Sequence, residues 1–554
     1  MNQLKNDVNI NIKNSCNVGK CKYSHQISID DIVKGISHIK PGKTDGDVGH
    51  CSDHILNGTH LLHKYLSILF NSVLCHGHSP DGIVLSTITS IPKCKRKSIN
   101  DSENYRGIAL SSILGKIFDW IILVKYSDIF ETTDLQFGFK PKHSTSQCTF
   151  VVKEVINYYL KNGGQVYVTL LDASKAFDRI NYVKLFKLLL RKGLCPLVSR
   201  FLLNMYTNQL VRVRWGDYTT TTFSVSNGVK QGGVLSPILF SIYVDELLTR
   251  LKQSGVGCHI GHIFVGSLAY ADDISLLSPT RQGLYKMLNI CKSFSTEYDV
   301  LFNPNKSKLL LFDNESCTSE NVPFCDAEIT AEKYETHLGN IIGPRINNED
   351  IKKLVNDFYS RFNILYSMFN HVPINVKYFL FKTYCMPLYG SQLWDFSSNN
   401  VNSFYVAWRK CIRRLLQISN LTHNNLLNVL CDDLPVDTQL HKRFLRFAHG
   451  IFCSSNSCVN ICGRVSINGS GSDFCKSLNF ISYKYKICKY DLSNSISSIS
   501  SSVENYVNVH SDWNVLQSAN NIFDFICMRE ELIRNRKFED AKNVNLIINH
   551  LCTN

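Results

Sequence analysis

Two apolar, β-prone runs that each end at aspartate constrain this chain more than any other feature. The stretch AYADDISLL, residues 269–277, places Asp272 and Asp273 between the runs SLAY and ISLLS. Such runs predict two strands, with the aspartate pair at the tip of a hairpin and at the edge of a sheet. Aspartate is common in turns, and a turn needs nothing further from the pair. A divalent metal site would need carboxylates from another strand as well.

The run QVYVTLLDASKAFD supplies such a strand. It is β-rich through VTLL, ends on Asp172 and is followed by a predicted helix. If this strand pairs beside the hairpin, three carboxylates meet at one sheet edge. They could hold two divalent cations roughly 3.5–4 Å apart and serve phosphoryl transfer. The carboxylates would raise one another's pKa values, so cations would be needed for all three to stay ionised.

A glycine pair opens the segment GVKQGGVLSPILF, residues 228–240. Gly232 and Gly233 would let the backbone approach a flat ligand closely. Ser236 and Pro237 suit the start of a helix, where proline fits the first turn. An ordinary glycine loop before a helix would look the same.

Composition sets the broad class. The chain has 554 residues, 44% of them hydrophobic, so several packed units are expected. It carries 60 Lys+Arg and 46 Asp+Glu, a balance that suits a polyanionic partner but also many other soluble proteins. The 21 cysteines are scattered, which predicts buried thiols in a reducing compartment. The N-terminus has no apolar signal segment, and Lys116 and Asp119 interrupt the longest apolar stretch, so neither secretion nor a membrane span is expected.

Several motifs, in order from about residue 27 to about residue 420, resemble those of reverse transcriptases of non-LTR (LINE-type) retrotransposons. They are PGKTDGD, TITSIPK with NYRGIALSS, QFGFKPKHSTSQC, LLDASKAFDRI, NGVKQGGVLSPILF, AYADD, FNPNKSKLLLF, HLGNIIG and PLYGSQLW. The family more often has proline at Gly107 and tyrosine at His337. Each motif alone is weak to moderate evidence, whereas their order is specific.

The resemblance implies an α+β right-hand polymerase with fingers, a palm built on an antiparallel sheet with helices, a helical thumb and a helical C-terminal tail. The expected divisions are a flexible arm (1–26), a helical extension (27–80), fingers and palm (81–345), thumb and connecting helices (346–450) and a C-terminal region (451–554).

The resemblance also implies residue roles. Asp172, Asp272 and Asp273 match metal-binding catalytic carboxylates. Lys306 matches a proton donor to pyrophosphate, although Lys308 lies close and either could be plain surface charge.

The nucleotide site would use Arg106, near the triphosphate, and Gln231, Gly232 and Gly233, against the incoming nucleotide and template base. Phe177, five residues after Asp172, matches an aromatic gate that excludes a 2′-hydroxyl; a core phenylalanine is the alternative. Asp178 is expected to be structural or near the site, not a ligand.

A basic helix is predicted at residues 404–418. One face carries Phe404, Trp408, Ile412 and Leu415, and the remainder carries Arg409, Lys410, Arg413 and Arg414. In a thumb these cations would contact a primer–template backbone. The alternative is an amphipathic helix with a solvated face.

The implied activity is RNA-directed DNA polymerisation with Mg²⁺ or Mn²⁺, using an RNA template, a DNA primer and dNTPs. Too few residues precede the fingers for an endonuclease, so a separate nuclease is expected to nick the target. An intracellular location in nucleus and cytoplasm is expected. Two alternatives stay open: an inactive or domesticated relic that binds RNA, and an intron-maturase-like splicing cofactor.

Overall fold

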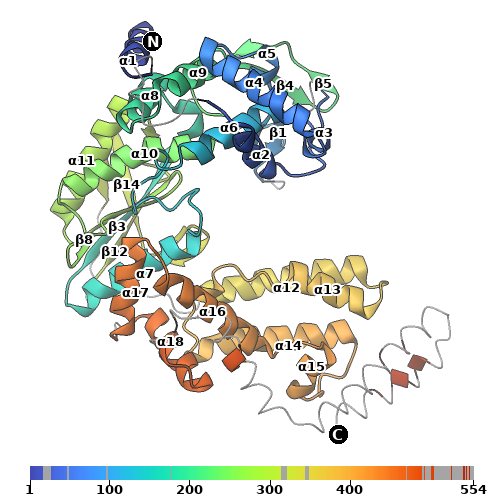
Figure 1. Ribbon diagram of the computed structural model, residues 1–554. Coiled ribbons are helices and arrows are strands. Elements are labelled where there is room, and N and C mark those ends of the chain that lie inside the picture. The colour runs from blue at the N-terminus through green and yellow to red at the C-terminus, as the bar shows by residue number, and fades with distance from the viewer. Residues whose placement is uncertain are drawn as a thin grey trace.

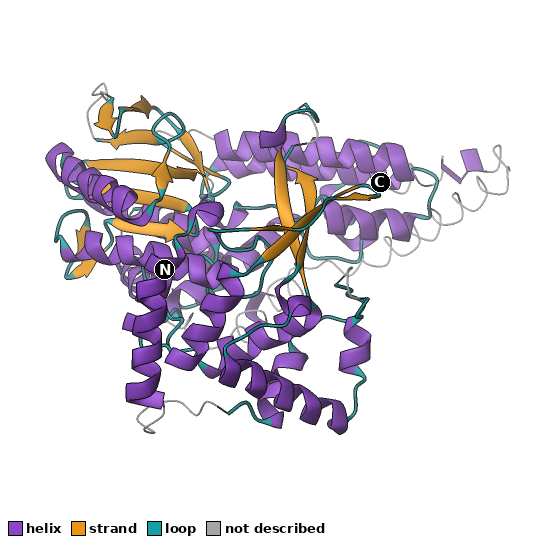
Figure 2. Cartoon of the chain, turned by 90° about the horizontal axis from the view of Figure 1, so that it is seen from above, coloured by secondary structure: helices purple, strands orange, loops and turns teal. Residues whose placement is uncertain are grey.

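The protein divides into two sheet-based parts and a helical part (Figure 1). The computed structural model describes residues 1–16, 26–45, 49–94, 98–174, 176–313, 321–343, 349–469 and 471–489, with isolated residues after 489. From above, the strands form two separate groups with helices around them (Figure 2). This division agrees with the fingers, palm and helical C-terminal region expected from the sequence.

The fingers are built on a five-stranded sheet of order β2-β1-β4-β5, with β6 beside β4. Its strands are β1 (Ser86–Pro92), β2 (Tyr105–Ser111), β4 (Leu210–Trp215), β5 (Tyr218–Thr219) and β6 (Phe223–Ser224). The helices around it are α2 (Ile29–Ser37), α3 (Ser52–Leu56), α4 (His60–His76), α5 (Asp81–Val84), α6 (Ile113–Lys125) and α9 (Pro196–Thr207). The alternating segment VRVRWGDYTTTTFSV, residues 211–225, contributes β4, β5 and β6 to this sheet.

The first 16 residues are not the flexible arm expected for them. Helix α1 (Asn2–Asn11) continues into a π-helical turn (Ile12–Cys16). Leu4, Val8 and Ile12 recur every four residues, are buried and place α1 against α9. The polar, asparagine-rich composition hid this short apolar stripe.

The palm is built on a seven-stranded sheet of order β13-β14-β12-β3-β10-β9, with β11 beside β3. Its strands are β3 (Val166–Ser174), β9 (Ser267–Tyr270), β10 (Asp273–Ser278), β11 (Leu301–Phe302), β12 (Lys308–Phe312), β13 (Val322–Phe324) and β14 (Ala327–Glu332). Helix α7 (Thr145–Lys161) contacts β3 and β9, whereas α10 (Ser236–Gln253) and α11 (Arg281–Tyr298) contact β9 and β10. Neighbouring residues of β3, such as Val168 and Thr169, are both buried, so the sheet is covered on both faces.

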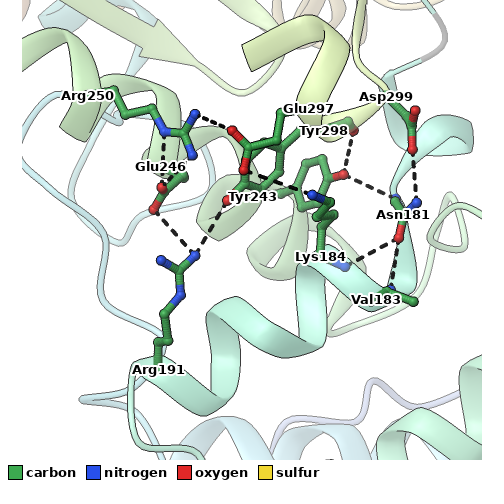
Figure 3. Close-up of polar contacts among 10 residues, drawn as sticks. All are labelled: Asn181, Val183, Lys184, Arg191, Tyr243, Glu246, Arg250, Glu297, Tyr298 and Asp299. Atoms are coloured by element: carbon green, nitrogen blue, oxygen red, sulfur yellow. Dashed lines mark hydrogen bonds and ion pairs between the residues drawn. The ribbon is translucent and has the colours of Figure 1, made fainter. Parts of the chain in front are cut away.

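A polar network joins the helices behind the palm sheet (Figure 3). Arg250 on α10 pairs with Glu297 on α11 (2.7 Å) and with Glu246 on its own helix (3.1 Å). The buried Tyr243 hydroxyl donates to the carbonyl oxygen of Tyr298 (2.5 Å). These ion pairs are partly exposed to solvent, which weakens them, and the buried Tyr243 hydroxyl adds a hydrogen bond between α10 and α11 that is shielded from water.

A small hairpin of β15 (Glu335–His337) and β16 (Asn340–Ile342), which overlaps the HLGNIIG motif, precedes the helical part. It comprises α12 (Glu349–Phe369), α13 (Ile374–Tyr384), α14 (Asn402–Leu416), α15 (Asn424–Leu430), α16 (Val436–Phe452), α17 (Ser457–Ile467) and α18 (Asp473–Tyr485). Helix α17 packs on α7, which fixes this part of the C-terminal region against the palm. Within the described parts of the chain, no helix combines the length and apolarity needed to cross a bilayer.

The segment PLYGSQLW, residues 387–394, joins the palm to the helical part. The Tyr389 hydroxyl donates to the Leu338 carbonyl oxygen at the tip of the β15–β16 hairpin (2.8 Å). Arg443 on α16 donates to the carbonyl oxygens of Met386 and Leu388 (3.1 Å each) and to Ser391 Oγ (3.2 Å). The motif that indicated the family is thus a structural junction.

The substitution Arg443→Ala should lower the free energy of unfolding by about 2–3 kcal/mol, because it removes three hydrogen bonds that tie α16 to residues 386–391. Denaturant titration measures this. Arg446→Ala, an exposed residue on the same helix, is the control and should stay within about 0.5 kcal/mol of wild type. Equal effects of the two substitutions would contradict the junction.

Candidate active site

Strand pairing places the three aspartates at one edge of the palm sheet. Strands β10 and β3 are antiparallel, and Asp273 lies directly opposite Asp172. Asp273 also pairs with Tyr270 of β9, so Ala271 and Asp272 form the tight turn of the β9–β10 hairpin. The predicted hairpin and its partner strand are therefore confirmed, and so is their adjacency.

Residues 136–138 hold the turn of Ala271 and Asp272 in an unusual backbone conformation, and nothing in their sequence alone indicated this contact. Ala271 has a φ of +60°, a left-handed value that costs free energy in a residue with a Cβ. Its N–H donates to Oε1 of the fully buried Gln136 (3.1 Å), which also accepts from the N–H of Gly138 (2.8 Å). A Cβ on Gly138 would lie 2.3 Å from the Ala271 nitrogen. The QFG sequence therefore shapes the aspartate turn; a glutamine two residues before a glycine is too common to signal this alone.

The aspartates perturb one another electrostatically. Desolvation, followed by the charges of Asp272 and Asp172, raises the pKa of Asp273 to about 6. Desolvation also raises the pKa of Asp272, Asp172 adds to the effect, and Arg106 opposes it. Both side chains reach the surface, so a cation could enter from solvent. Crowding of this kind favours a site that binds positive charge.

The carboxylate oxygens of the three aspartates suit a hard cation such as Mg²⁺, although they do not surround it completely. Among the described residues, no three His, Cys, Asp or Glu side chains are grouped closely enough to hold a metal ion by themselves. Mg²⁺ commonly takes one or two carboxylates and fills its other positions with water and substrate phosphates. Asp172 and its opposite neighbour Asp273, with Asp272 in the adjoining turn, fit that pattern.

Backbone contacts bring the glycine-rich loop against both the palm and the fingers. The N–H of Val229 donates to the carbonyl oxygen of Phe177 (2.8 Å), and a Cβ on Gly228 would lie 2.8 Å from the Cα of Asp178. On the fingers side, the N–H of Ala109 on β2 donates to the carbonyl oxygen of Gln231 (2.7 Å). Asp178 therefore helps to seat the loop through its backbone.

The two glycines differ in their constraints. Gly232 has a φ of +105°, and a Cβ there would lie 2.9 Å from the Ala109 carbonyl oxygen. A Cβ on Gly233 would meet Ser236 Oγ at 2.6 Å. Gly232 is exposed and Gly233 half-buried, and the expected contact of their backbone with a ligand stays a prediction.

The remaining candidates lie around the aspartates. Arg106 is exposed on β2, and its charge acts on Asp272. Phe177 is half-buried and its ring stacks on Phe240 of α10, with centroids 4.5 Å apart. This contact fixes one ring face and fits either a gate or a core residue, so the gate role stays a prediction.

The two lysines of the segment FNPNKSKLLLF have different surroundings. Lys308 forms an ion pair with Glu332 (3.0 Å), whereas Lys306 is exposed. The next residue, Ser307, accepts a hydrogen bond from the N–H of Asp172 (3.2 Å). The loop that carries both lysines is therefore tied to Asp172, and Lys306 is the one without the ion pair to Glu332; its role as a proton donor stays a prediction.

A charge interaction between Asp119 and Lys230, behind the glycine-rich loop, was missed at the sequence level, where Asp119 only interrupted an apolar run. Burial raises the pKa of Asp119 on α6 to about 7, and the positive charge of Lys230 opposes this shift. Burial lowers the pKa of Lys230 to about 8, and its Nζ donates to the carbonyl oxygen of Val84 (3.2 Å). Asp119 also accepts a backbone hydrogen bond from Leu235, just before α10. No sequence motif marks such a pair, because its partners come from distant segments.

The basic helix is α14, and its predicted apolar face is buried. Two of its cations are engaged within the helical part. Arg413 donates to the Thr422 carbonyl oxygen (2.6 Å), and Arg414 donates to Asn363 (3.0 Å) and lies 4.6 Å over the Tyr366 ring. Lys410 is exposed and Arg409 half-buried, so these two are the freer candidates for nucleic-acid contact.

His337, at a position where the family more often has tyrosine, is buried between the β15–β16 hairpin and the palm. Its imidazole is hydrogen-bonded to Ser275 Oγ (3.0 Å), two residues beyond Asp273 on β10. Burial lowers its pKa to about 4, so the ring is neutral at neutral pH. The substitution thus keeps a polar tie to the strand that carries the aspartates.

Comparison with known proteins identifies the fingers and palm. Residues 91–346 match the family described as reverse transcriptase (RNA-dependent DNA polymerase). This region is a reverse transcriptase domain. A Pol polyprotein from a type-2 retrotransposable element of Drosophila melanogaster is 27% identical over 238 residues, 43% of this chain and 22% of that protein. The RNA-directed DNA polymerase from mobile element jockey of the same species is 24% identical over 375 residues, 64% of this chain and 40% of that protein.

Both relatives are proteins of mobile genetic elements, which agrees with the resemblance found in the motifs. The chain spans less than half the length of either relative. Among solved structures, the telomerase from Candida albicans in complex with a fragment of telomeric RNA is 13% identical, with a TM-score of 0.36, over 79% of this chain and 70% of that chain.

The substitution Gly138→Ala should lower any polymerase activity by at least about 10-fold, because its methyl group would displace Ala271 and the aspartate turn. Nucleotide incorporation at saturating substrate measures this. Gly450→Ala on α16 is the matched control: it meets no atom within 4 Å and should leave activity unchanged. Full activity of Gly138→Ala would contradict the role of the QFG segment.

The raised pKa of Asp273 predicts a pH-dependent stability change. The folded protein holds this proton more tightly than the unfolded chain, whose carboxyl has a pKa near 3.8. The stability from this proton is present below pH about 4 and lost as pH rises through about 6. Asp273→Asn should therefore raise the Tm of the metal-free protein by roughly 2 °C at about pH 8 and leave it unchanged at about pH 4. A lower Tm for the variant at the higher pH would contradict the repulsion.

Proposed function

We propose that this protein is an RNA-directed DNA polymerase of a non-LTR retrotransposon, which extends a primer 3′-hydroxyl with deoxynucleotides on an RNA template. One observation carries the proposal: Asp172 and Asp273 lie opposite each other on paired strands, with Asp272 in the adjoining turn. The family match over residues 91–346 supports it. The alternatives of an inactive relic and a splicing cofactor gain no support from the relatives.

The side chains have distinct tasks in this reaction. Asp172, Asp272 and Asp273 would hold Mg²⁺ or Mn²⁺, which would neutralise triphosphate charge and acidify the primer hydroxyl. Arg106 would bind the triphosphate from the fingers side, and Lys306 would donate a proton to the departing pyrophosphate. Gln231, Gly232 and Gly233 would position the nucleotide through backbone contacts. The raised pKa values of Asp272 and Asp273 mean that metal loading weakens in acid, where protons compete for these two carboxylates.

The partners follow from the reaction. The chain would bind an RNA template, a DNA primer and dNTPs, with Arg409 and Lys410 on the primer–template backbone. An endonuclease would nick the target. Action in the nucleus and cytoplasm of the host cell fits this chemistry.

Primer extension on poly(rA)/oligo(dT) tests the activity. Wild type should incorporate dTTP with Mg²⁺ or Mn²⁺, and Asp272→Asn should reduce incorporation by at least about 100-fold, since it removes a carboxylate at the metal site. Asp326→Asn, a palm aspartate outside the site, is the control and should match wild type. No incorporation by wild type, or equal incorporation by Asp272→Asn, would reject the proposal.

The gate role of Phe177 has its own test. Phe177→Ala should admit ribonucleotides and raise the ratio of rUTP to dTTP incorporation by about 10-fold or more, because the ring no longer meets the 2′-hydroxyl. Steady-state kinetics with each nucleotide measure the ratio. An unchanged ratio would assign Phe177 to the core.

A further inference from the structure

The outer edge of β2 carries backbone groups that no other described strand covers. Strand β2 is the end strand of the fingers sheet and pairs with β1. The N–H of Lys93, just after β1, donates to the carbonyl oxygen of Asn104 (2.6 Å), so Asn104 and every second residue after it face β1. The N–H of Ala109 donates instead to the carbonyl oxygen of Gln231 (2.7 Å) in the glycine-rich loop. Ala109 and the residues two positions from it on β2 therefore face outward.

Gly107 is one of these outward-facing residues. Its N–H points away from β1 and has no hydrogen-bond partner among the described residues. The outward N–H groups on either side are engaged, since Tyr105 donates to the Ser102 carbonyl oxygen and Ala109 donates to the glycine-rich loop. Gly107 is half-buried and has no Cβ, so a ligand can approach its N–H closely. In the described part of the chain, one backbone donor is thus open on this edge between Tyr105 and Ala109.

The neighbours of this donor indicate what it binds. Arg106, the preceding residue, is exposed, and its charge acts on Asp272. Ala109 lies two residues further along the strand, roughly 7 Å away, and is bonded to Gln231. Gly107 therefore lies between the two groups of the fingers that connect to the aspartates and to the glycine-rich loop. An N–H beside a guanidinium group suits a phosphate oxygen, because anionic oxygens accept stronger hydrogen bonds than neutral acceptors.

A peptide strand added to this edge fits less well. Strand addition uses a row of free N–H and C=O groups along an exposed edge. Here the N–H groups of Tyr105 and Ala109 are already bonded, and only the Gly107 donor between them is open among the described residues. A single open donor suits a point contact with one oxygen atom of a ligand.

Proline, which the family more often has at this position, has no N–H and could not make such a contact. The Gly107 donor is therefore an addition to the contact expected from Arg106. Its loss should weaken binding of the ligand without abolishing it.

We propose that the backbone N–H of Gly107 donates a hydrogen bond to a phosphate oxygen of the incoming deoxynucleotide, next to Arg106. The identity of the ligand rests on the proposed function, whereas the open donor rests on the strand register alone. Gly107 is thus a further nucleotide-binding residue, and it acts through its backbone.

Binding of dTTP to the full chain tests the proposal. The chain is bound with Mg²⁺ to labelled oligo(rA)/oligo(dT) whose primer ends in a dideoxynucleotide, so that no bond can form, and anisotropy reports retention of the duplex as dTTP is added. Gly107→Pro should weaken dTTP binding on the order of 10-fold, because it removes a hydrogen bond to a charged group. Proline is tolerated at an edge position whose N–H faces outward.

Gly107→Ala is the conservative variant, because it keeps the N–H. Its methyl group would lie 3.0 Å from Ile88 Cγ2, a side-chain atom that can shift, so most of the dTTP affinity should remain. The affinity of both variants for the duplex without dTTP should match that of wild type. If Gly107→Pro lowers the Tm by more than about 5 °C, replacing the amide before residue 107 by an ester removes the same N–H without a ring, and its dTTP affinity decides.

The other outcomes overturn the proposal. Equal dTTP affinity of Gly107→Pro and wild type would mean that the N–H binds only water. Equal losses in Gly107→Pro and Gly107→Ala would assign the effect to the added carbon atoms, and a loss of duplex affinity alone would assign the donor to a template phosphate. Normal dTTP binding by wild type without extension of an unblocked primer would reject the proposed function and leave the Gly107 contact standing.

Discussion

The pairing of β3 with β10 is the constraint on which the site depends. Antiparallel register sets Asp273 opposite Asp172, and a slip of one residue would turn one carboxylate to the other face of the sheet. The strands are buried on both sides by helices, which fixes that register. The energetic consequence is that desolvation, and after it repulsion among the carboxylates, raises the pKa values of Asp272 and Asp273. The fold therefore stabilises an arrangement that its own charges oppose.

Segments far apart in the chain share the work of holding this arrangement. Gln136 accepts a hydrogen bond from Ala271 in the aspartate turn, and Gly138 packs closely against the same residue. The Ser307 hydroxyl accepts a hydrogen bond from the backbone N–H of Asp172. The glycine-rich loop is bonded to β2, which carries Arg106. A displacement of the fingers would therefore move the glycine-rich loop, because Ala109 of β2 and Gln231 of the loop share a backbone hydrogen bond.

The catalytic strands and the apolar face of α14 could be predicted because each is a local pattern: strand alternation ending in aspartate, and apolar residues at helical spacing. The structure confirms both. The helix at residues 2–11 was missed because only Leu4, Val8 and Ile12 mark it in a polar sequence. The pair of Asp119 and Lys230, and the hold of Gln136 on Ala271, could not be predicted, because each joins segments more than 100 residues apart. A local sequence pattern does not indicate contacts between such distant segments. The cations of α14 were visible, but not that Arg413 and Arg414 are engaged by neighbouring helices.

The central claim is that the carboxylates of Asp172, Asp272 and Asp273 form one cation site. Electron paramagnetic resonance of Mn²⁺, titrated into the full chain with primer–template, tests it directly. Wild type should bind Mn²⁺, and Asp172→Asn should weaken binding on the order of 10-fold or more, because it removes a ligand while the strands stay paired. Equal Mn²⁺ affinity of wild type and Asp172→Asn would contradict the account.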